Sequence, residues 1–256
     1  MKILTIGDVV GSCGLNYLQD RLWQYRDKTG VDFVVANGEN VTNVRGLSRA
    51  DAEALLRCGV DLITLGNHAF GMKDLYGFLD EDERIIRPAN YPAGSPGNGY
   101  VIRNVDGWRI LFINVQGTVF MEPLNSPFEA IERILSRESG QFDSAVIDVH
   151  AESTSEKLAV ARTFSGQAAV IFGTHTHVAT ADEQILPGGT GYITDIGMTG
   201  AVDSILGTVT ENVLVRFRTH LPAPMDAAAG KASASGALFT VDPAKNTCTA
   251  LSRISF

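Results

Sequence analysis

The sequence predicts an α/β protein in which parallel strands alternate with helices. In the first half of the chain, short apolar runs end at glycine or a polar residue, and segments with helical apolar spacing follow them. This βαβαβ order is typical of a parallel sheet covered by helices on both faces. Further strand signals later in the chain favour mixed sheets. Because the sequence has no internal repeat and no evident linker, we expect one domain over residues 1–256.

The first half contains three predicted strands, over residues 2–7, 32–36 and 61–65. Each is an apolar run closed by glycine or a polar side chain. The leucines after the first strand recur every three or four residues, and Ser48 suits the N-cap position of the second helix. The predicted helices of this half are 14–27, 48–58 and 72–80.

The middle of the chain predicts a hairpin followed by two helix–strand pairs. Asp106-Gly107 lies between two apolar runs, which favours a hairpin turn. The tail is richer in strand signals, and residues 222–235, with Pro, Ala, Gly and Ser, predict a surface loop. The predicted helices are 127–138 and 153–165, and the predicted strands are 100–105, 108–115, 144–149, 168–172, 183–186, 190–194, 212–218, 236–241 and 247–254.

Composition and charge exclude several classes of protein. Hydrophobic residues make up 45% and charged residues 20% of the 256 residues, as in ordinary globular proteins. No apolar run is long enough for a membrane span, and Asp8 falls where a signal peptide would need apolar residues, so we expect a cytoplasmic protein without a membrane partner. The net charge of −8 argues against extended nucleic-acid binding. Three widely separated cysteines predict neither a disulfide framework nor a thiolate zinc site.

Metal-binding residue types follow five of the predicted strands, each just beyond the carboxyl end of its strand. Ligands of open α/β sheets bind at this edge, so these residues are expected to meet at one rim. A simpler interpretation is that each is a polar residue ending a strand. Four of the five histidines in the chain lie at these positions, which argues against it, whereas His220 is expected on the surface. The residues are Asp8, Glu39, Asn40, Asn67, His68, His150, His175 and His177.

These side chains offer a mixed nitrogen and oxygen ligand set. Such a set suits iron, manganese or zinc better than calcium or magnesium. Seven ligands are too many for one tetrahedral ion and enough for two ions with positions left for water or substrate. We therefore predict two transition-metal ions, with iron favoured, manganese compatible and zinc left open. The predicted ligands are Asp8, Glu39, Asn40, Asn67, His150, His175 and His177.

Several motifs together resemble the calcineurin-like metallophosphoesterases and, more narrowly, their YmdB-type branch. The resemblance extends over nearly the whole chain. It implies a four-layer α/β/β/α sandwich, in which helices flank two mixed β-sheets, and 2′,3′-cyclic-nucleotide phosphodiesterase activity on a small nucleotide-like phosphoester. It also implies a homo-oligomer. The motifs are Gly7-Asp8-Val9-Val10-Gly11, Asn37-Gly38-Glu39-Asn40, Gly66-Asn67-His68, Arg87-Pro88-Ala89-Asn90-Tyr91-Pro92, Asp148-Val149-His150-Ala151-Glu152, Gly173-Thr174-His175-Thr176-His177 and the stretch from Ala181 to Gly200.

The resemblance also implies a role for each residue of the site. His68 would protonate the leaving group after a hydroxide held between the ions attacks phosphorus in line. A structural role for His68, in which it orients Asn67 or a ligand water, stays open. The superfamily's Asp-x-His histidine is missing here, and Asn40 takes its place as in the narrower branch. The first ion would be held by Asp8, Glu39, Asn40 and His177, and the second by Glu39, Asn67, His150 and His175, with Glu39 as the bridge.

Two departures from the family pattern leave the substrate preference open. Ala69-Phe70-Gly71 replaces an expected aromatic-Asp pair, and Val41-Thr42-Asn43-Val44-Arg45-Gly46 replaces small residues that lead to a glycine-rich turn. A broad-specificity phosphomonoesterase and a regulatory nucleotide- or RNA-associated protein of low turnover are the alternatives. A redox di-iron enzyme is a further one, although such enzymes more often use Glu-x-x-His pairs, which this sequence lacks.

Overall fold

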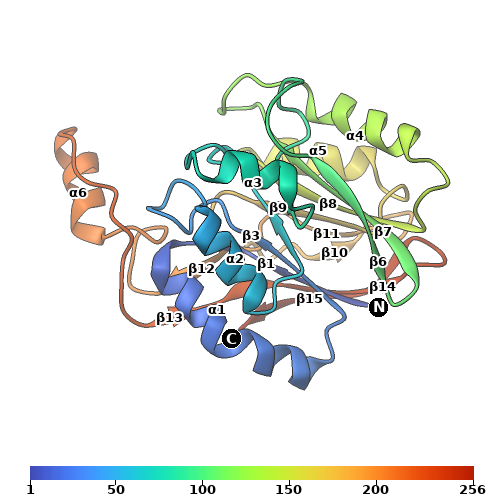
Figure 1. The fold of residues 1–256 in the computed structure, drawn as a ribbon, viewed down its shortest axis with the longest axis horizontal. Coiled ribbons are helices and arrows are strands. Elements are labelled where there is room, and N and C mark those ends of the chain that lie inside the picture. The colour runs from blue at the N-terminus through green and yellow to red at the C-terminus, as the bar shows by residue number, and fades with distance from the viewer.

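The structure, a computed structural model of residues 1–256, contains two six-stranded β-sheets with helices on their outer faces (Figure 1). In the first sheet four neighbouring strands run parallel, and two strands from the C-terminal part of the chain extend it in antiparallel orientation. The beginning and the end of the chain therefore share one sheet. Its strands, in spatial order, are β15 (Thr247–Ser255), β14 (Ser235–Asp242), β1 (Lys2–Ile6), β3 (Phe33–Asn37), β4 (Leu62–Thr64) and β5 (Ile85–Ile86).

The second sheet is formed by the middle of the chain and is also mixed. It begins with the predicted hairpin, in which Asp106 and Gly107 both have positive φ, as a tight two-residue turn requires. Its central strands are parallel, and the strand at the other edge is antiparallel. Its strands, in spatial order, are β10 (Gln184–Ile185), β11 (Gly191–Ile193), β9 (Val170–Thr174), β8 (Ser144–His150), β7 (Trp108–Gln116) and β6 (Tyr100–Val105).

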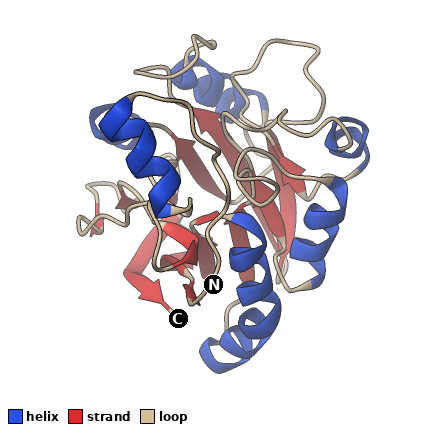
Figure 2. Ribbon diagram, turned by 90° about the vertical axis from the view of Figure 1, so that its left-hand side faces the viewer, coloured by secondary structure: helices blue, strands red, loops and turns tan.

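Three apolar clusters separate four layers. One cluster lies between the first sheet and its helices, one between the two sheets, and one between the second sheet and its helices. Phe33 and Phe112 stack across the sheet–sheet interface with their centroids 4.8 Å apart. Figure 2 shows the strands inside and the helices around them. The expected α/β/β/α sandwich is confirmed, with α1 (Gly11–Thr29), α2 (Arg49–Arg57) and α3 (Leu75–Glu81) on the first sheet and α4 (Pro127–Arg137) and α5 (Thr154–Thr163) on the second.

The helix signals in the sequence correspond to real packing and capping. Leu15, Leu18 and Leu22 form the buried side of α1. Ser48 caps α2 by accepting a hydrogen bond from the backbone N–H of Asp51, as predicted. Apolar spacing and capping thus place both helices correctly.

The predicted strand over residues 212–218 is wrong, because this segment lies within helix α6 (Thr210–Thr219). Its valines and alternating pattern favour a strand. The helix stands away from both sheets (Figure 1), and only Val213 on it is buried. A segment without a neighbouring strand cannot pair its backbone in a sheet, whereas a helix satisfies its own N–H and C=O groups.

A small third sheet beside the main two was not predicted. It joins β2 (Asp8–Val9), β12 (Met198–Ala201) and β13 (Ala232–Ser233), in the order β13-β12-β2. Strand β13 lies within the predicted surface loop 222–235. Their brevity explains why no period-2 pattern revealed them.

None of the six helices combines the length and the apolar character that a membrane span needs.

Candidate metal centre

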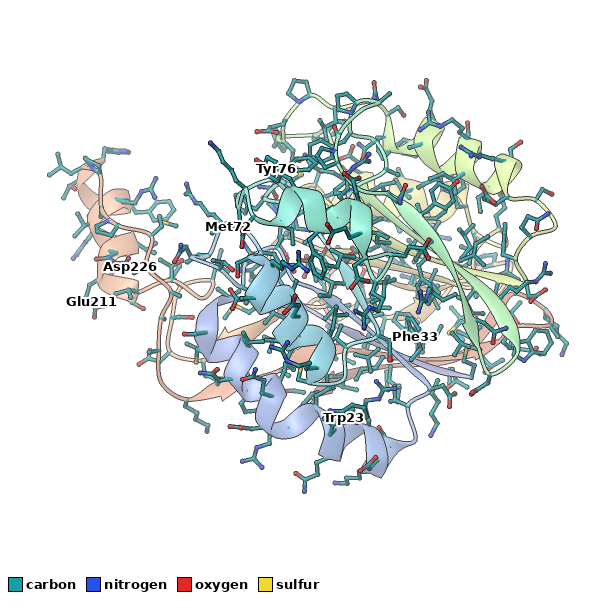
Figure 3. All side chains as sticks on the ribbon, in the orientation of Figure 1. Trp23, Phe33, Met72, Tyr76, Glu211 and Asp226 are labelled. Atoms are coloured by element: carbon teal, nitrogen blue, oxygen red, sulfur yellow. The ribbon has the colours of Figure 1, made fainter.

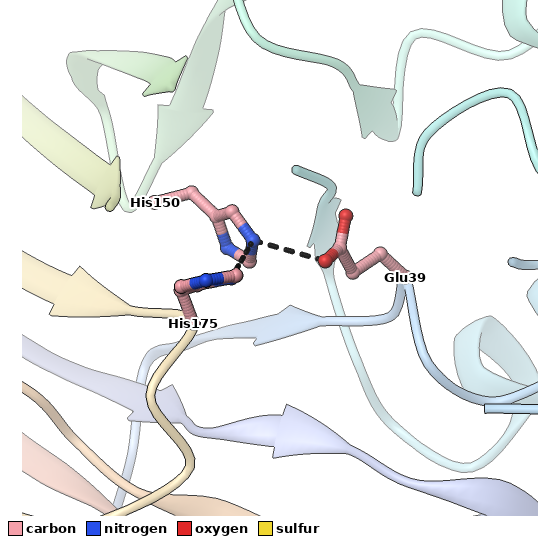
Figure 4. Close-up of side chains that lie close together, drawn as sticks. All are labelled: Glu39, His150 and His175. Carbon is pink, nitrogen blue, oxygen red and sulfur yellow. Dashed lines mark hydrogen bonds and ion pairs between the residues drawn. The ribbon is translucent and has the colours of Figure 1, made fainter. Parts of the chain in front are cut away.

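The two main sheets bring the carboxyl ends of their strands together, and the predicted site residues collect there. Asp8 opens β2 directly after β1, and His150 is the last residue of β8. Loops that leave β3, β4 and β9 supply the others. Figure 4 shows that Glu39, His150 and His175 approach one another from three different loops and strands. All eight predicted residues therefore lie at or near one rim.

Three potential ligand atoms surround Nε2 of His150. Glu39 Oε1 lies 2.9 Å, Asn67 Oδ1 3.0 Å and His175 Nδ1 3.1 Å from this nitrogen. Ligand atoms of Glu39, His150 and His175 all lie within 4.8 Å of one another. A carboxylate, an amide oxygen and two imidazoles that converge on one point are a typical transition-metal ligand set.

A second group of ligand atoms lies beside the first. Oδ1 of Asp8 is 3.7 Å from Nε2 of His177. This Asp8 oxygen and Oδ1 of Asn40 are buried and have no hydrogen-bond partner. A buried polar atom without a partner costs about 1–3 kcal/mol, so both oxygens suit a bound cation.

The other polar atoms of Asn40 and His177 are occupied. Nδ2 of Asn40 donates to the carbonyl oxygen of Val44 at 2.7 Å, which leaves its Oδ1 free. Nδ1 of His177 lies 3.1 Å from the carbonyl oxygen of Leu206, which leaves its Nε2 directed toward Asp8. Local hydrogen bonds thus orient both side chains as metal ligands would need to be.

Burial sets the charges of the site. It raises the pKa of Asp8 and of Glu39, although nearby histidines partly oppose this. Burial also lowers the pKa of His150 and of His175 to about 4, so both rings are neutral near pH 7 and can offer a lone pair. Two buried carboxylates are costly unless a cation offsets their charge. The donor atoms and the charges therefore both fit a metal centre.

His68 lies at the border of the site. Its backbone N–H donates to Glu39 Oε2 at 2.7 Å, and its side chain lines a cavity of about 380 Å³ together with Glu39, His175 and His177. Nε2 of His68 is also 3.4 Å from Nδ2 of Asn67. His68 can therefore contact a substrate, and it also touches a predicted ligand.

The sequence profile of YmdB-like proteins matches residues 4–254. The chain belongs to the YmdB-like family. The resemblance to this branch is thereby confirmed.

Three similar proteins match this chain over almost their whole length. The 2′,3′-cyclic-nucleotide 2′-phosphodiesterase of Bacillus subtilis is 40% identical over 99% of this chain and 96% of its own. A crystal structure of a hypothetical protein from Thermus thermophilus has a TM-score of 0.94 and 43% identity, and covers 100% of this chain and 99% of its own. The structure of a novel phosphatase from Mycoplasma pneumoniae also has a TM-score of 0.94, with 32% identity, and covers 100% of this chain and 93% of its own.

In this YmdB-like protein a buried hydrogen-bond chain supports His150. Thr174 Oγ1 lies 2.9 Å from Nδ1 of His150, closer than Nδ2 of Asn37 at 3.3 Å. The Thr174 hydroxyl donates to Asp148 Oδ1 at 2.8 Å. If Nδ1 carries the proton, Nε2 is free to face Glu39. Burial raises the pKa of Asp148 to about 8. Asp148 and Thr174 lie in two separate family motifs, and neither motif indicates that these residues act through His150.

The loop that carries His175 and His177 is held by a second buried group. Asp195 Oδ2 accepts hydrogen bonds from the backbone N–H and the hydroxyl of Thr176, at 3.1 and 2.8 Å, and pairs with Lys157 Nζ at 2.7 Å. Both histidines have positive φ, 96° and 63°, which costs energy in residues other than glycine. The loop must therefore be held in place. From the sequence, Asp195 suggests mainly turn hydrogen bonds, and Lys157 gives no signal at all.

Proposed function

We propose that this protein is a dinuclear metal-dependent phosphodiesterase that hydrolyses 2′,3′-cyclic nucleotides. The observation that carries the proposal is the convergence of Glu39, Asn67 and His175 on Nε2 of His150, at 2.9–3.1 Å. The chain is a hydrolase of phosphoester bonds, which is the class of its Bacillus and Mycoplasma relatives. The preference for a cyclic diester is taken from the Bacillus relative.

We assign the ligands to two ions that share Glu39. Asp8, Asn40 and His177 would complete the first ligand set, which includes the two oxygens without partners. Two metal ions bound there would lower the pKa of water and polarise the phosphoryl oxygens. Iron or manganese suits this mixed donor set, and zinc is a further option. The second ion would be held by Glu39, Asn67, His150 and His175.

The protein's own groups supply the rest of the reaction. His68 borders the cavity and would donate a proton to the ribose oxygen that leaves phosphorus when the cyclic diester opens. The hydrogen bond from its backbone to Glu39 fixes its Cα relative to the metal centre. Asp148 and Asp195 would hold His150 and the 175–177 loop in place without touching the substrate.

A phosphomonoesterase is the alternative that a specific observation favours. The Mycoplasma neighbour, at 32% identity and a TM-score of 0.94, is a phosphatase. The same metal centre could serve both chemistries. Parallel assays of 2′,3′-cyclic AMP and of 3′-AMP by the same preparation separate the two.

Elemental analysis combined with an assay tests the main proposal. We expect about two transition-metal ions per chain and hydrolysis of 2′,3′-cyclic AMP. Chelation should remove the ions and abolish hydrolysis, and added iron or manganese should restore activity. Asp8→Asn should reduce metal content and activity together. The matched control is Glu53→Gln, a surface carboxylate on α2, which should change neither. Metal-free protein with undiminished hydrolysis would refute the proposal.

We also propose that the protein forms a homo-oligomer. Leu214 and Val215 on α6 and Leu221 after it expose between 42% and 61% of their surface, which is typical of residues that contact another subunit. Light scattering after size-exclusion chromatography measures the mass directly. A monomeric mass at assay concentrations would contradict this part of the proposal.

A further inference from the structure

The cavity beside the metal centre has two chemically different sides. Glu39, His68, His175 and His177 line it toward the metal centre. A second group of lining residues, all from the 205–225 part of the chain, is apolar. We call it the apolar wall, and it consists of Ile205, Leu206, Val213, Phe217 and Met225.

Helix α6 supplies the largest side chain of this wall. Val213 is the buried residue of the helix, and Phe217 follows one turn later on the same face, so both border the cavity. Phe217 nevertheless exposes 78% of its surface. An exposed phenylalanine beside a catalytic cavity is suited to contact a flat apolar group of a ligand.

The wall is connected to the metal centre and to the helix by hydrogen bonds. The carbonyl oxygen of Leu206 contacts Nδ1 of His177 at 3.1 Å, so the wall begins beside a predicted ligand. Asp226, the neighbour of Met225, accepts from Nδ2 of Asn212 on α6 at 3.3 Å. Figure 3 shows Asp226 close to α6, near Glu211 in the first turn of the helix. The 225–226 segment therefore lies against the helix.

The unusual 41–46 segment adds a cation to the same cavity. Arg45 lines it, and the carbonyl oxygen of the preceding Val44 accepts from the predicted ligand Asn40. Val44 has φ of 62°, which is rare for a β-branched residue. The departure from the family pattern thus places a positive charge in the lining of the cavity.

We propose that the apolar wall, chiefly through Phe217, binds the base of a mononucleotide whose phosphate lies at the metal centre. A ligand with an anionic end and a flat apolar end matches the two sides of the cavity. The volume of about 380 Å³ lies near the lower end for small-molecule sites, which suits one nucleotide. This inference rests on the proposed phosphodiesterase function and names the part of the substrate that the protein selects.

The test compares two diesters that share a five-membered cyclic phosphate. One is 2′,3′-cyclic AMP, and the other is glycerol 1,2-cyclic phosphate, which has no base. For Phe217→Ala we expect the ratio of kcat/KM for cyclic AMP to that for the glycerol diester to fall about 5- to 100-fold, because stacking on an aromatic ring is lost. The change should lie mainly in KM for cyclic AMP. Phe217→Tyr should restore the ratio.

A matched variant controls for general effects on the helix. Arg218→Ala truncates another exposed side chain of α6 that does not line the cavity. Both diesters carry the same charge, so it should leave the ratio unchanged. Calorimetric titration with 3′-AMP, in the His68→Ala background so that turnover is suppressed, measures binding directly, and Phe217→Ala should weaken it by a similar factor. Because Phe217 is largely exposed, its variants should fold.

The outcomes separate the two proposals. If the parent protein hydrolyses neither diester, the proposed function is wrong. In that case the base site is judged by 3′-AMP binding alone, and unchanged affinity in Phe217→Ala would overturn it as well. If the parent hydrolyses both diesters and Phe217→Ala leaves the ratio and the 3′-AMP affinity unchanged, the phosphodiesterase proposal stands and the base site is wrong.

Discussion

Lys157 Nζ lies 2.7 Å from Asp195 Oδ2 in an ion pair that is completely buried behind the candidate metal centre. Asp195 also accepts hydrogen bonds from the backbone N–H and the hydroxyl of Thr176, the residue between His175 and His177. The pair therefore connects helix α5 to the loop that carries two predicted metal ligands. Removing one partner would leave a buried charge and release this loop.

We expect Lys157→Met to destabilise the protein by about 3–5 kcal/mol, the usual cost of breaking a buried ion pair. Metal affinity should fall as well, because Asp195 would no longer be fixed. Urea denaturation and elemental analysis measure the two effects. Lys245→Met is the control. It removes a largely exposed partner of Asp242 and should cost at most about 1 kcal/mol. Equal effects of the two substitutions would refute the role given to the buried pair.

Gly66→Ala should disable the site without altering any proposed ligand. A Cβ at this position would lie 2.1 Å from Cδ2 and 2.2 Å from Nε2 of His150, so the ring would have to move. We expect metal content and hydrolysis to fall together. Gly77→Ala is the matched control, because its Cβ meets nothing within 4 Å in helix α3 and the change should stabilise the helix by about 0.5–1 kcal/mol. Normal metal content in Gly66→Ala would contradict this geometry.

His68→Ala should retain metal but lose turnover. General acid catalysis typically contributes about 10²–10⁴ in rate, so kcat for 2′,3′-cyclic AMP should fall by a factor in this range. Elemental analysis of the same preparation distinguishes the two roles. A parallel loss of metal would favour the alternative that His68 orients Asn67, which its 3.4 Å contact permits. Full activity would remove His68 from the mechanism.

The cysteines should differ in their reactivity toward iodoacetamide. Burial raises the pKa of Cys58 and of Cys248 to about 11, so both remain protonated thiols at pH 8, and the nucleophilic thiolate is scarce. Cys13 is only half-buried. Mass spectrometry should find one label in the native chain and, in denaturant, labels on Cys58 and Cys248 too. Cys13→Ser should stay unlabelled when native, and fast native labelling of Cys58 would contradict the burial argument.

The sequence patterns by themselves predicted the α/β class and the strand ends that carry the predicted site residues, and the family resemblance implied the two-sheet sandwich. Apolar runs fix strands locally, and the polar residue after each run must lie at the sheet edge where that strand ends. This local rule places Asp8, Glu39 and His150 at strand ends, and the packing of the two sheets brings those ends to one rim. The family motifs added the resemblance that extends over nearly the whole chain, and the family comparison bears it out.

Only the tertiary structure decided what surrounds that rim. Whether residues 212–218 form a strand or a helix depends on a neighbouring strand, and none lies beside α6. Lys157 gives no signal in its helix, because its partner Asp195 lies 38 positions away in the chain. The position of Phe217 at the cavity likewise depends on tertiary structure, because the other residues that line this cavity come from distant parts of the chain. Local patterns determine elements and their ends, whereas contacts between distant segments exist only once the chain has folded.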